Sequence, residues 1–416
     1  MSTSRRPHAQ RPVIGIVSHN AYGALTGGTH GHVGGVEWQT SLTARWLAAR
    51  GYSVRLLTWD EGQPDGVEID GVRVVKICRR NAGVPGVRFF HPRWSGLSRA
   101  LHAAAADVYY HNCGEYVTGQ VALWCRRRRL PFVYSVASNP DCDPRLPEMR
   151  KLRERVLYRY GLLHADEVIV QTRSQQEMLA HGFGRTSSVI PMPCPGPSDD
   201  EYVPPAPPRP GTARVAWVGR IVPLKRLEWL LDLAVQLPVT AFDIVGAAEA
   251  DTAYTRALRA RAAQLPNVTL HGRIERARMP EVYRRANCLC CTSSHEGFPN
   301  TFLEAFSYGV PVVSTIDPDG LLVARGLGAT ATDVPGLLAE LRALLGGAAR
   351  WRATSQSARQ YYRENHTVAV VLPRFEHAFL TAIERKRAGR RCMFDPAWPA
   401  LRSPAESCAT GNGADR

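Results

Sequence analysis

The sequence has 416 residues and a formal net charge of +15, and 44% of its residues are hydrophobic. This length suits two domains of roughly 150–200 residues each, and the composition excludes a disordered, collagen-like or fibrous chain. No stretch approaches the roughly 18 consecutive apolar residues that span a membrane, and residues 1–12 lack the apolar core of a signal peptide, so we expect a cytoplasmic protein with a disordered N-terminal tail.

The N-terminal half alternates between short β-rich runs and helical patterns. A strand at 13–18 is followed by a glycine-rich loop at 23–35 and an amphipathic helix at 36–50. This alternation predicts a parallel sheet covered by helices over residues 13–190. Further strands are expected at 53–58, 72–76, 108–111, 132–136 and 168–170, and further helices at 97–105, 118–128, 146–163 and 174–181.

The segment 191–211 is dense in proline, which forbids a helix or a central strand and favours an extended domain linker. After it the alternation restarts, which predicts a second α/β domain over 212–365. Its strands are expected at 213–218, 241–245, 268–270, 288–292 and 310–314, and its helices at 224–237, 251–264, 280–285, 301–308, 334–345 and 348–364. A last helix at 368–386 lies within a closing segment, 366–388, and is followed by a polar tail at 389–416.

The positive charge favours an anionic partner, which can be a nucleic acid, an anionic membrane surface or a phosphorylated substrate. Composition does not choose among these partners. The sequence contains only four lysines, so a coding bias toward arginine accounts for much of the excess and makes each lysine notable: Lys76, Lys151, Lys225 and Lys386.

Parallel sheets bind ligands at the carboxyl ends of their strands, so the loops that follow the strands are the candidate functional segments. The most informative loop runs from 293 to 305 and enters a helix near Asn300 or Thr301, where free amides form an anion site. Glu296 and Glu304 lie before and after this helix start and can accept hydrogen bonds from sugar hydroxyls. The alternative is that Glu304 supports the helix through its dipole and Glu296 is a solvated loop charge.

A second loop follows the first strand after the linker. Gly219 permits a close approach to the backbone, and Arg220 and Lys225 straddle a turn from which both cations can reach one diphosphate. A solvated basic turn is the alternative interpretation.

Two loops of the N-terminal domain complete the candidate site. Gly34 and Gly35 precede the first long helix, where a ligand can approach the amides, although tight helix packing explains them as well. His111 ends a strand and is either a structural histidine or a ligand contact, with Tyr110 and Asn112 as competitors for that position.

The segment EGFPNTFLEAFSYGVPVVST resembles the Glu, seven residues, Glu motif of the retaining glycosyltransferases of family four, and the Gly219 to Lys225 loop is similar to the donor-phosphate motif of that family. The resemblance implies the GT-B fold, an α/β architecture of two Rossmann-like doubly wound domains that face a central cleft. The N-terminal domain would bind the acceptor and the C-terminal domain the nucleotide sugar, with the closing helix crossing back to the N-terminal domain. Pro299, Asn300 and Thr301 replace the residues most frequent between the two glutamates, which obscures the identity of the sugar.

The resemblance also implies an activity: metal-independent, retaining transfer of a sugar from a nucleoside diphosphate sugar, with UDP or GDP expected as the carrier, to an acceptor hydroxyl. No cofactor is expected. Catalytic roles would fall to Glu296, Arg220, Lys225 and His111, and donor-binding roles to Gly34, Gly35, Gly219, Arg220, Lys225, Arg273, Ile274, Gly297, Phe298, Pro299, Asn300, Thr301 and Glu304. A sugar or lipid-linked acceptor used in surface polysaccharide or glycolipid synthesis follows from the habits of the family.

Three metal-binding patterns can be set aside. The pairs Asp141 with Asp143 and Asp317 with Asp319 resemble metal sites of another glycosyltransferase fold, but the first ends an acceptor-side strand and the second is typical of a turn. The cluster of Cys288, Cys290 and Cys291 lies in a predicted strand, where alternation sends its members to opposite faces. We expect the ten cysteines to be reduced thiols and no metal to be bound.

Several alternatives remain open at this point. A nucleotide-sugar epimerase or a catalytically silent sugar-nucleotide-binding subunit would share the fold. Nucleic-acid binding explains the charge but none of the four loops, and the basic run at 126–129 lacks interleaved aromatic residues, so no nucleic acid is expected. That run leaves open a peripheral contact with an anionic membrane at the inner face of the plasma membrane.

Overall fold

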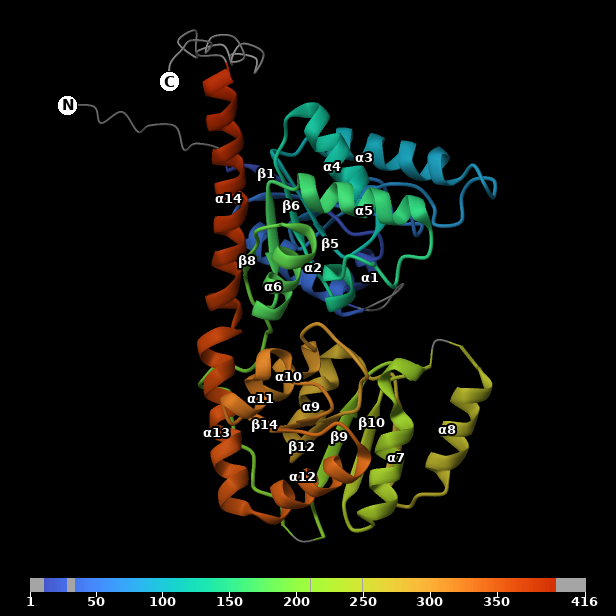
Figure 1. The fold of residues 1–416 in the computed structure, drawn as a ribbon, viewed down its shortest axis with the longest axis vertical. Helices are drawn as coiled ribbons and strands as arrows, with labels where there is room; N and C mark the ends of the chain where they lie inside the picture. Colours follow the sequence, from blue (N-terminus) through green and yellow to red (C-terminus); the bar gives the residue numbers. More distant parts are fainter. Residues whose placement is uncertain (1–10, 28–33, 210, 249, 394–416) are drawn as a thin grey trace, which may run out of the picture.

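The computed structural model describes residues 11–27, 34–209, 211–248 and 250–393. These residues form two α/β domains stacked along the longest axis of the molecule, with a column of two helices beside them (Figure 1). In the described part of the chain, no helix is long and apolar enough to cross a membrane. The predicted tails at 1–12 and 389–416 fall mostly outside the described residues, and residues 28–33 of the glycine-rich loop fall wholly outside them.

In the described residues, the N-terminal domain is built on an eight-stranded sheet in the order β3-β4-β2-β1-β5-β6-β7-β8. All neighbouring strands are parallel except β3 and β4, which pair antiparallel. The strands are β1 (Val13–Val17), β2 (Ser53–Thr58), β3 (Glu68–Ile69), β4 (Val72–Lys76), β5 (Val108–Asn112), β6 (Phe132–Ser135), β7 (Glu167–Val170) and β8 (Ser188–Val189). The helices are α1 (Ala21–Leu25), α2 (Gly35–Ala49), α3 (Ser95–Ala104), α4 (Tyr116–Arg128), α5 (Leu152–His164) and α6 (Arg173–Phe183).

The C-terminal domain has a six-stranded parallel sheet among its described residues, in the order β11-β10-β9-β12-β13-β14. Its four inner strands are almost wholly buried, because helices cover both faces, whereas the edge strands β11 and β14 are largely unburied. The strands are β9 (Arg214–Val218), β10 (Ala241–Val245), β11 (Val268–Gly272), β12 (Cys288–Cys291), β13 (Val312–Ser314) and β14 (Gly328–Thr330). The helices are α7 (Leu227–Gln236), α8 (Ala253–Ala263), α9 (Met279–Arg285), α10 (Asn300–Ser307), α11 (Leu321–Ala324), α12 (Val334–Gly346) and α13 (Ala348–Asn365).

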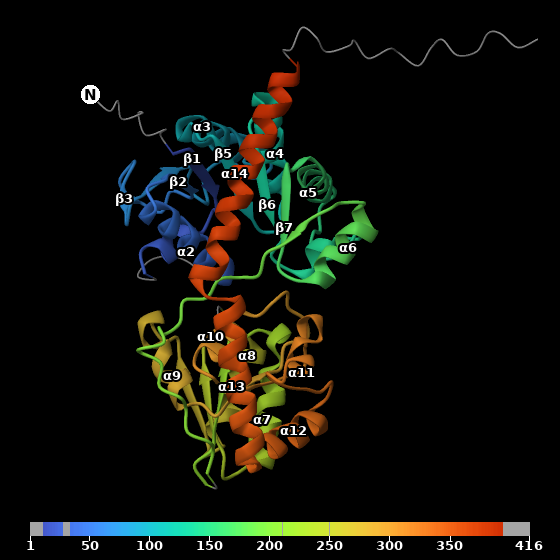
Figure 2. The ribbon, with the colours of Figure 1, turned by 90° about the vertical axis from the view of Figure 1, so that its left-hand side faces the viewer.

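The chain passes between the domains twice. The proline-rich segment after β8 leads from the first sheet to the second, and α14 (Val368–Met393) leads back from the end of α13 along the N-terminal domain (Figure 2). Apolar residues of α14 join the same buried cluster as strands β1, β2, β4 and β5; they are Val371, Leu372, Phe375, Phe379 and Ile383. The last helix is therefore part of the N-terminal core.

Two local expectations were wrong, and one short strand was not expected. The predicted loop at 23–35 begins inside a short helix, α1, whose residues Ala21, Ala24 and Leu25 are buried. The helix expected at 146–163 begins only at Leu152, because Leu146 has a positive φ of 48° and Pro147 follows it. The antiparallel β3 is too short, at two residues, to produce a periodic pattern.

Candidate functional site

Both sheets reverse their strand order at one point, and these points define the candidate site. In the N-terminal sheet the reversal lies between β1 and β5, and in the C-terminal sheet it lies between β9 and β12. Ligands of doubly wound proteins bind outside the carboxyl ends of the strands at such a point. The predicted residues other than Arg273 and Ile274 lie at or after the ends of these four strands, so the topology brings them to the boundary between the domains.

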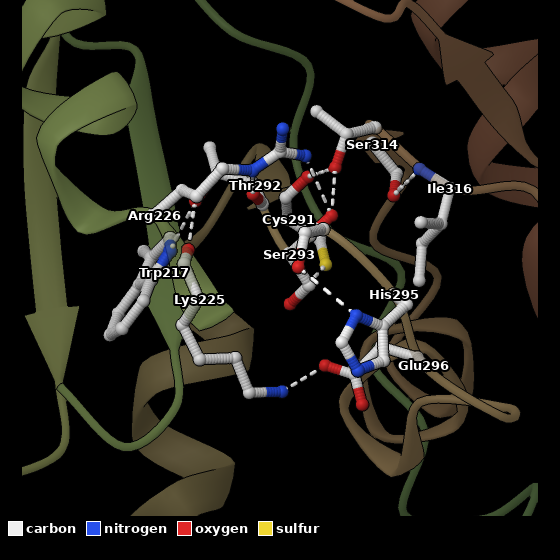
Figure 3. A network of polar contacts seen from close by, with 12 residues as sticks. Trp217, Lys225, Arg226, Cys291, Thr292, Ser293, His295, Glu296, Ser314 and Ile316 are labelled. Atoms are coloured by element: carbon white, nitrogen blue, oxygen red, sulfur yellow. Dashed lines mark hydrogen bonds and ion pairs between the residues drawn. The ribbon is translucent and has the colours of Figure 1, made fainter. Parts of the chain in front are cut away.

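Lys225 and Glu296 meet at the reversal point of the C-terminal sheet. The Lys225 ammonium forms an ion pair with Glu296 Oε1, and about a fifth of each side chain is exposed (Figure 3). The Lys225 stem folds back over Gly219, where an added Cβ would lie 3.7 Å from Lys225 Cδ. The structure thus brings Glu296 together with Gly219 and Lys225, which lie in another loop more than 70 positions earlier in the chain.

Arg226 and Thr292 hold the two loops around this ion pair. Arg226, at a positive φ of 45°, donates to the carbonyl oxygens of Thr292 at 2.7 Å and of Ser293 at 2.8 Å. The Thr292 hydroxyl donates to the Lys225 carbonyl at 2.6 Å and accepts from the Trp217 indole at 3.1 Å (Figure 3). These bonds fix the backbone on both sides of Lys225 and Glu296.

Glu304 lies inside α10 with one protein partner on each carboxylate oxygen. Arg276 donates to Oε1 at 2.5 Å and the Tyr283 hydroxyl donates to Oε2 at 2.6 Å. Burial and the adjacent Glu304 charge raise the pKa of Tyr283, which keeps its hydroxyl a donor. Each carboxylate oxygen retains a further lone pair, so Glu304 can still accept hydrogen bonds from a ligand.

The start of α10 lies against the start of α2 across the domain boundary. Asn300 is the first residue of α10, and its Oδ1 accepts from the Gln39 amide of α2 at 3.0 Å. A Cβ on Gly35 would lie 2.6 Å from Asn300 Nδ2, so the Asn300 side chain packs directly against the backbone of Gly35 and would have to shift for a larger residue. Among the described residues no group accepts from the Asn300 and Thr301 amides, and Pro299 supplies the extended residue before the helix.

Gly297 and Phe298 form a second contact between the domains. The Phe298 amide donates to the Gln171 side chain at 3.2 Å, just beyond β7. A Cβ on Gly297 would lie 2.8 Å from the Ala137 carbonyl oxygen, so the close approach of these two backbone segments requires glycine at 297. The loop with Glu296 is therefore clamped against the N-terminal domain.

The remaining predicted donor-binding residues follow the carboxyl ends of two different strands, β9 and β11. Arg220 is exposed just beyond β9, and Arg273 is exposed just beyond β11. Ile274 lines a small cavity of about 60 Å³ with Asp243, His271 and Val282. The structure does not bring Arg273 or Ile274 into contact with Lys225 or Glu296 through any interaction of the described residues.

His111 is buried at the reversal point of the N-terminal sheet. Its Nδ1 lies 2.8 Å from the Val17 carbonyl oxygen, and burial lowers its pKa to about 4, so the ring is neutral with the proton on Nδ1. Its Nε2 lies 3.6 Å from Glu115 Oε1 and forms no hydrogen bond among the described residues. Tyr110, a competitor for this position, points into the core against Phe375 and Phe379.

The metal-like patterns have structural partners. Asp141 accepts from the Ser138 amide at 3.1 Å, Asp143 pairs with Arg145 at 2.7 Å, and Asp319 accepts from the amides of Arg173 and Ser174. Cys288 and Cys290 are buried in β12. In the described ranges, no group of three His, Cys, Asp or Glu side chains is arranged to hold a metal ion.

Four functional side chains had no local signal in the sequence. Arg276 and Tyr283 hold Glu304, and Gln39 and Gln171 hold the loop around Asn300, but each comes from another element. Glu115 did offer a signal, because it lies four residues after His111 at the end of the same strand.

Two family models match the chain. The model described as Glycosyl transferases group 1 matches residues 212–346, and the model described as Glycosyl transferase 4-like domain matches residues 34–195. The division between the matches falls in the proline-rich segment that separates the two sheets.

Curated relatives and solved structures agree with these matches. The chain is 25% identical to a D-inositol 3-phosphate glycosyltransferase of Xylanimonas cellulosilytica over 74% of this chain and 81% of that protein, and 27% identical to one of Gordonia bronchialis over 72% of each. In fold it is similar to sucrose-phosphate synthase of Thermosynechococcus elongatus, with a TM-score of 0.71 at 18% identity over 90% of this chain and all of the other. It is also similar to Anabaena HepE in complex with UDP and glucose, with a TM-score of 0.70 at 17% identity over 89% of this chain and all of the other.

Proposed function

We propose that this chain, which belongs to the group 1 glycosyltransferases of family four and has the GT-B fold, moves a sugar from a nucleoside diphosphate sugar to an acceptor hydroxyl. The transfer would retain the configuration of the sugar and would need no metal ion. The observation that carries this proposal is the meeting of Lys225 with Glu296 at the reversal point of the C-terminal sheet. A solved structure of similar fold is in complex with UDP-glucose, which supports a nucleotide sugar as the donor. UDP or GDP is the expected carrier.

The donor diphosphate would replace Glu296 as the partner of Lys225. An ammonium beside a developing phosphate charge stabilises the leaving group without a metal ion, and Arg220 on the same loop adds a second cation. Glu296, released from Lys225, would then accept hydrogen bonds from hydroxyls of the donor sugar. The unengaged amides at the start of α10 offer donors to a phosphate oxygen.

Glu304 would hold the ribose of the donor. Arg276 and Tyr283 orient its carboxylate, and Arg276 also lies over the Trp38 ring of α2, with 4.0 Å from its Cζ to the ring centroid. Arg273 and Ile274 would border the base. Because Arg276 touches both domains, ribose binding would be linked to their arrangement.

In the reaction the bond from the sugar C1 to the diphosphate oxygen breaks, and a bond from C1 to the acceptor oxygen forms on the same face. The leaving phosphate oxygen takes the acceptor proton, so no separate base is needed. His111 would contact the acceptor through Nε2. The names of the curated relatives support a polyol acceptor, and lipid-linked acceptors and contact with an anionic membrane are part of the same proposal.

The first test is nucleotide binding by the wild type and by Lys225→Met. A nucleotide that binds only the folded protein raises its melting temperature, and we expect UDP or GDP to do so equally with and without EDTA. Loss of one charge-assisted bond of about 1.5–3 kcal/mol should weaken binding by about 10- to 100-fold in Lys225→Met. The control Lys151→Met removes an exposed lysine and should bind as the wild type does. Equal affinity in all three proteins would remove Lys225 from the phosphate site.

The second part of the test addresses Glu296 and the stereochemistry. Glu296→Gln should keep the melting temperature within a few degrees and lower kcat by about 100-fold or more, since a charged contact to the reacting sugar is lost. The anomeric proton coupling of the product, measured by NMR, should show the same configuration as the donor. An inverted product would overturn the retaining mechanism.

A further inference from the structure

The acceptor side of the domain boundary carries three carboxylates, Glu37, Glu115 and Asp141, which we call the carboxylate cluster. Glu37 lies in the first turn of α2, Glu115 immediately precedes α4, and Asp141 lies in a short turn after β6. An added Cβ on Gly114 would lie 1.9 Å from Asp141 Oδ1, so this carboxylate packs directly against the backbone beside Glu115. Glu115 and Asp141 thus lie together beyond the carboxyl ends of β5 and β6, and Glu37, from the helix after β1, is near enough for its charge to raise the pKa of Glu115.

No strong cation balances these carboxylates. Among the described residues, no lysine or arginine forms an ion pair with any of the three, although the chain as a whole carries a charge of +15. Glu37 accepts from the Gly34 amide at 3.1 Å, and Asp141 accepts from the amides of Ala137 and Ser138. The positive charge of Arg93 lies at the margin of the cluster, where it helps to lower the pKa of His19 and opposes the rise in the pKa of Tyr116.

The two partners of Glu115 are neutral histidines. His19 Nδ1 and His111 Nε2 lie 3.7 and 3.6 Å from Glu115 Oε1. Burial lowers the pKa of His19 to about 3 and that of His111 to about 4, so neither ring supplies a positive charge near pH 7. Burial and the repulsion of Glu37 and Asp141 raise the pKa of Glu115 to about 7. Burial also raises the pKa of Asp141 to about 6. The cluster therefore carries its full negative charge only above pH 7, and no lysine or arginine among the described residues then pairs with it.

His111 also leaves a polar atom without a partner at the same place. Its side chain is 1% exposed, and its Nε2 forms no hydrogen bond among the described residues while it faces Glu115. With the proton on Nδ1, Nε2 is an acceptor. A ligand that offers both a hydroxyl donor and a positive charge would satisfy His111 and the carboxylate cluster together.

We propose that the acceptor carries an amino group, which Glu115 binds as an ammonium ion with Glu37 and Asp141 nearby, while His111 Nε2 accepts from an acceptor hydroxyl. This inference rests on the proposed glycosyl transfer and narrows its acceptor to an amino-substituted polyol or sugar. A phosphate-bearing acceptor, such as the one in the names of the curated relatives, would place its anion against three carboxylates.

The test compares three cyclitols that share one ring and differ in the charge of one substituent: an aminodeoxy-inositol, myo-inositol and D-inositol 3-phosphate. Each is titrated into the full-length protein at pH 8 and low salt, with and without saturating UDP or GDP, and binding is followed by calorimetry or ligand NMR. We expect the amine to bind at least tenfold more tightly than myo-inositol, and the phosphate to bind most weakly. Equal binding of the amine and myo-inositol, or tighter binding of the phosphate, would overturn the inference.

Substitutions test whether the carboxylate cluster causes the preference for the amine. Glu115→Gln keeps the shape and removes the charge, so the preference for the amine should fall to nearly equal binding while nucleotide affinity is unchanged. Glu68→Gln neutralises an exposed carboxylate on the edge strand β3 and should keep the full preference. If Glu115→Gln does not fold, Glu37→Gln should show a smaller loss of the same kind, and a full preference in the folded variant would contradict the proposal.

The outcomes separate this inference from the proposed function. Nucleotide binding without a preference for the amine leaves the glycosyl transfer standing and overturns the acceptor class. In the opposite case the protein prefers the amine, Glu115→Gln abolishes this preference, and neither UDP nor GDP binds. That result supports the ammonium site and overturns the donor proposal.

Discussion

His366 shows how a single buried side chain can tie distant segments together. It lies between α13 and α14, its Nδ1 is 2.9 Å from the Met192 carbonyl oxygen, and its own carbonyl accepts from the Cys194 amide at 2.8 Å. Burial lowers its pKa to about 4, against an ordinary value of 6.5. The neutral ring therefore stabilises the fold above pH 6.5, and this stabilisation is lost as the pH falls toward 4, because the unfolded chain takes up the proton first.

We expect His366→Asn to reduce the sensitivity of the fold to acid. The asparagine amide can still donate to the Met192 carbonyl but does not titrate, so the loss of unfolding free energy between pH 7.5 and pH 5 should shrink by about 2 kcal/mol. Urea unfolding at the two pH values measures this difference. His377→Asn, at an exposed position of α14, serves as the control, and a pH dependence identical in His366→Asn and the wild type would contradict the argument.

The residues of the site could be predicted only where the signal lay within one loop. Glu296, Lys225 and Gly219 were found because each follows a strand in a segment with a recognisable pattern, and the structure brings them together. Their roles in transfer stay predictions. Arg276 and Tyr283 could not be found in this way, because their positions beside Glu304 depend on how α9 and its preceding turn pack on α10.

At the scale of elements, strands were predicted best where the sequence pattern has clear ends. The expected bounds of β2, β4 and β10 are confirmed, since β-branched and leucine-rich runs between turn residues leave little choice of boundary. Short elements such as α1, β3 and β8 were missed because two to five residues carry no period. The expected GT-B architecture of two parallel-sheet domains is confirmed.

Helix α14 contributes to the N-terminal core through aromatic side chains. The Phe379 ring lies 5.3 Å from the Tyr110 ring of β5, centroid to centroid, and its side chain is 1% exposed. We expect Phe379→Ala to lower the free energy of unfolding by about 3–5 kcal/mol, as is usual when a buried phenylalanine is truncated. Urea unfolding should show this loss in Phe379→Ala and a change below about 0.5 kcal/mol in Glu384→Ala, an exposed position of the same helix. A loss below about 1 kcal/mol in Phe379→Ala would show that α14 packs loosely.

At the scale of the whole molecule, the two domains meet through few and mostly polar contacts. Asp319 of the C-terminal domain accepts from the amides of Arg173 and Ser174 at 2.7 and 2.9 Å, at the start of α6. Gln39 with Asn300 and Gln171 with Phe298 supply two more contacts. Small polar interfaces of this kind allow domains to move relative to one another.

We expect Asp319→Arg to open the molecule, because a cation at the start of α6 opposes the helix dipole and lies beside Arg173. Small-angle scattering should show a larger radius of gyration than for the wild type, with unchanged secondary structure by circular dichroism. Asp251→Arg changes the charge equally but lies among Arg256 and Arg259 of its own domain, so its radius should not change. Equal radii for all three proteins would show that Asp319 does not hold the domains together.

The return of α14 has a consequence for how this protein is made. The N-terminal domain buries its sheet against Val371, Phe375 and Phe379, which are synthesised only after the strands of the C-terminal domain. Until these residues emerge, the apolar face around Ile14, Leu56 and Tyr110 is covered only in part, by α1 and α2, although most of that domain's own chain has long been available. The C-terminal domain has all of its strands by residue 330 and can form its sheet earlier. The order of completion is therefore the reverse of the order of synthesis, and a ribosome that stops near residue 365 releases a chain whose N-terminal core is still open.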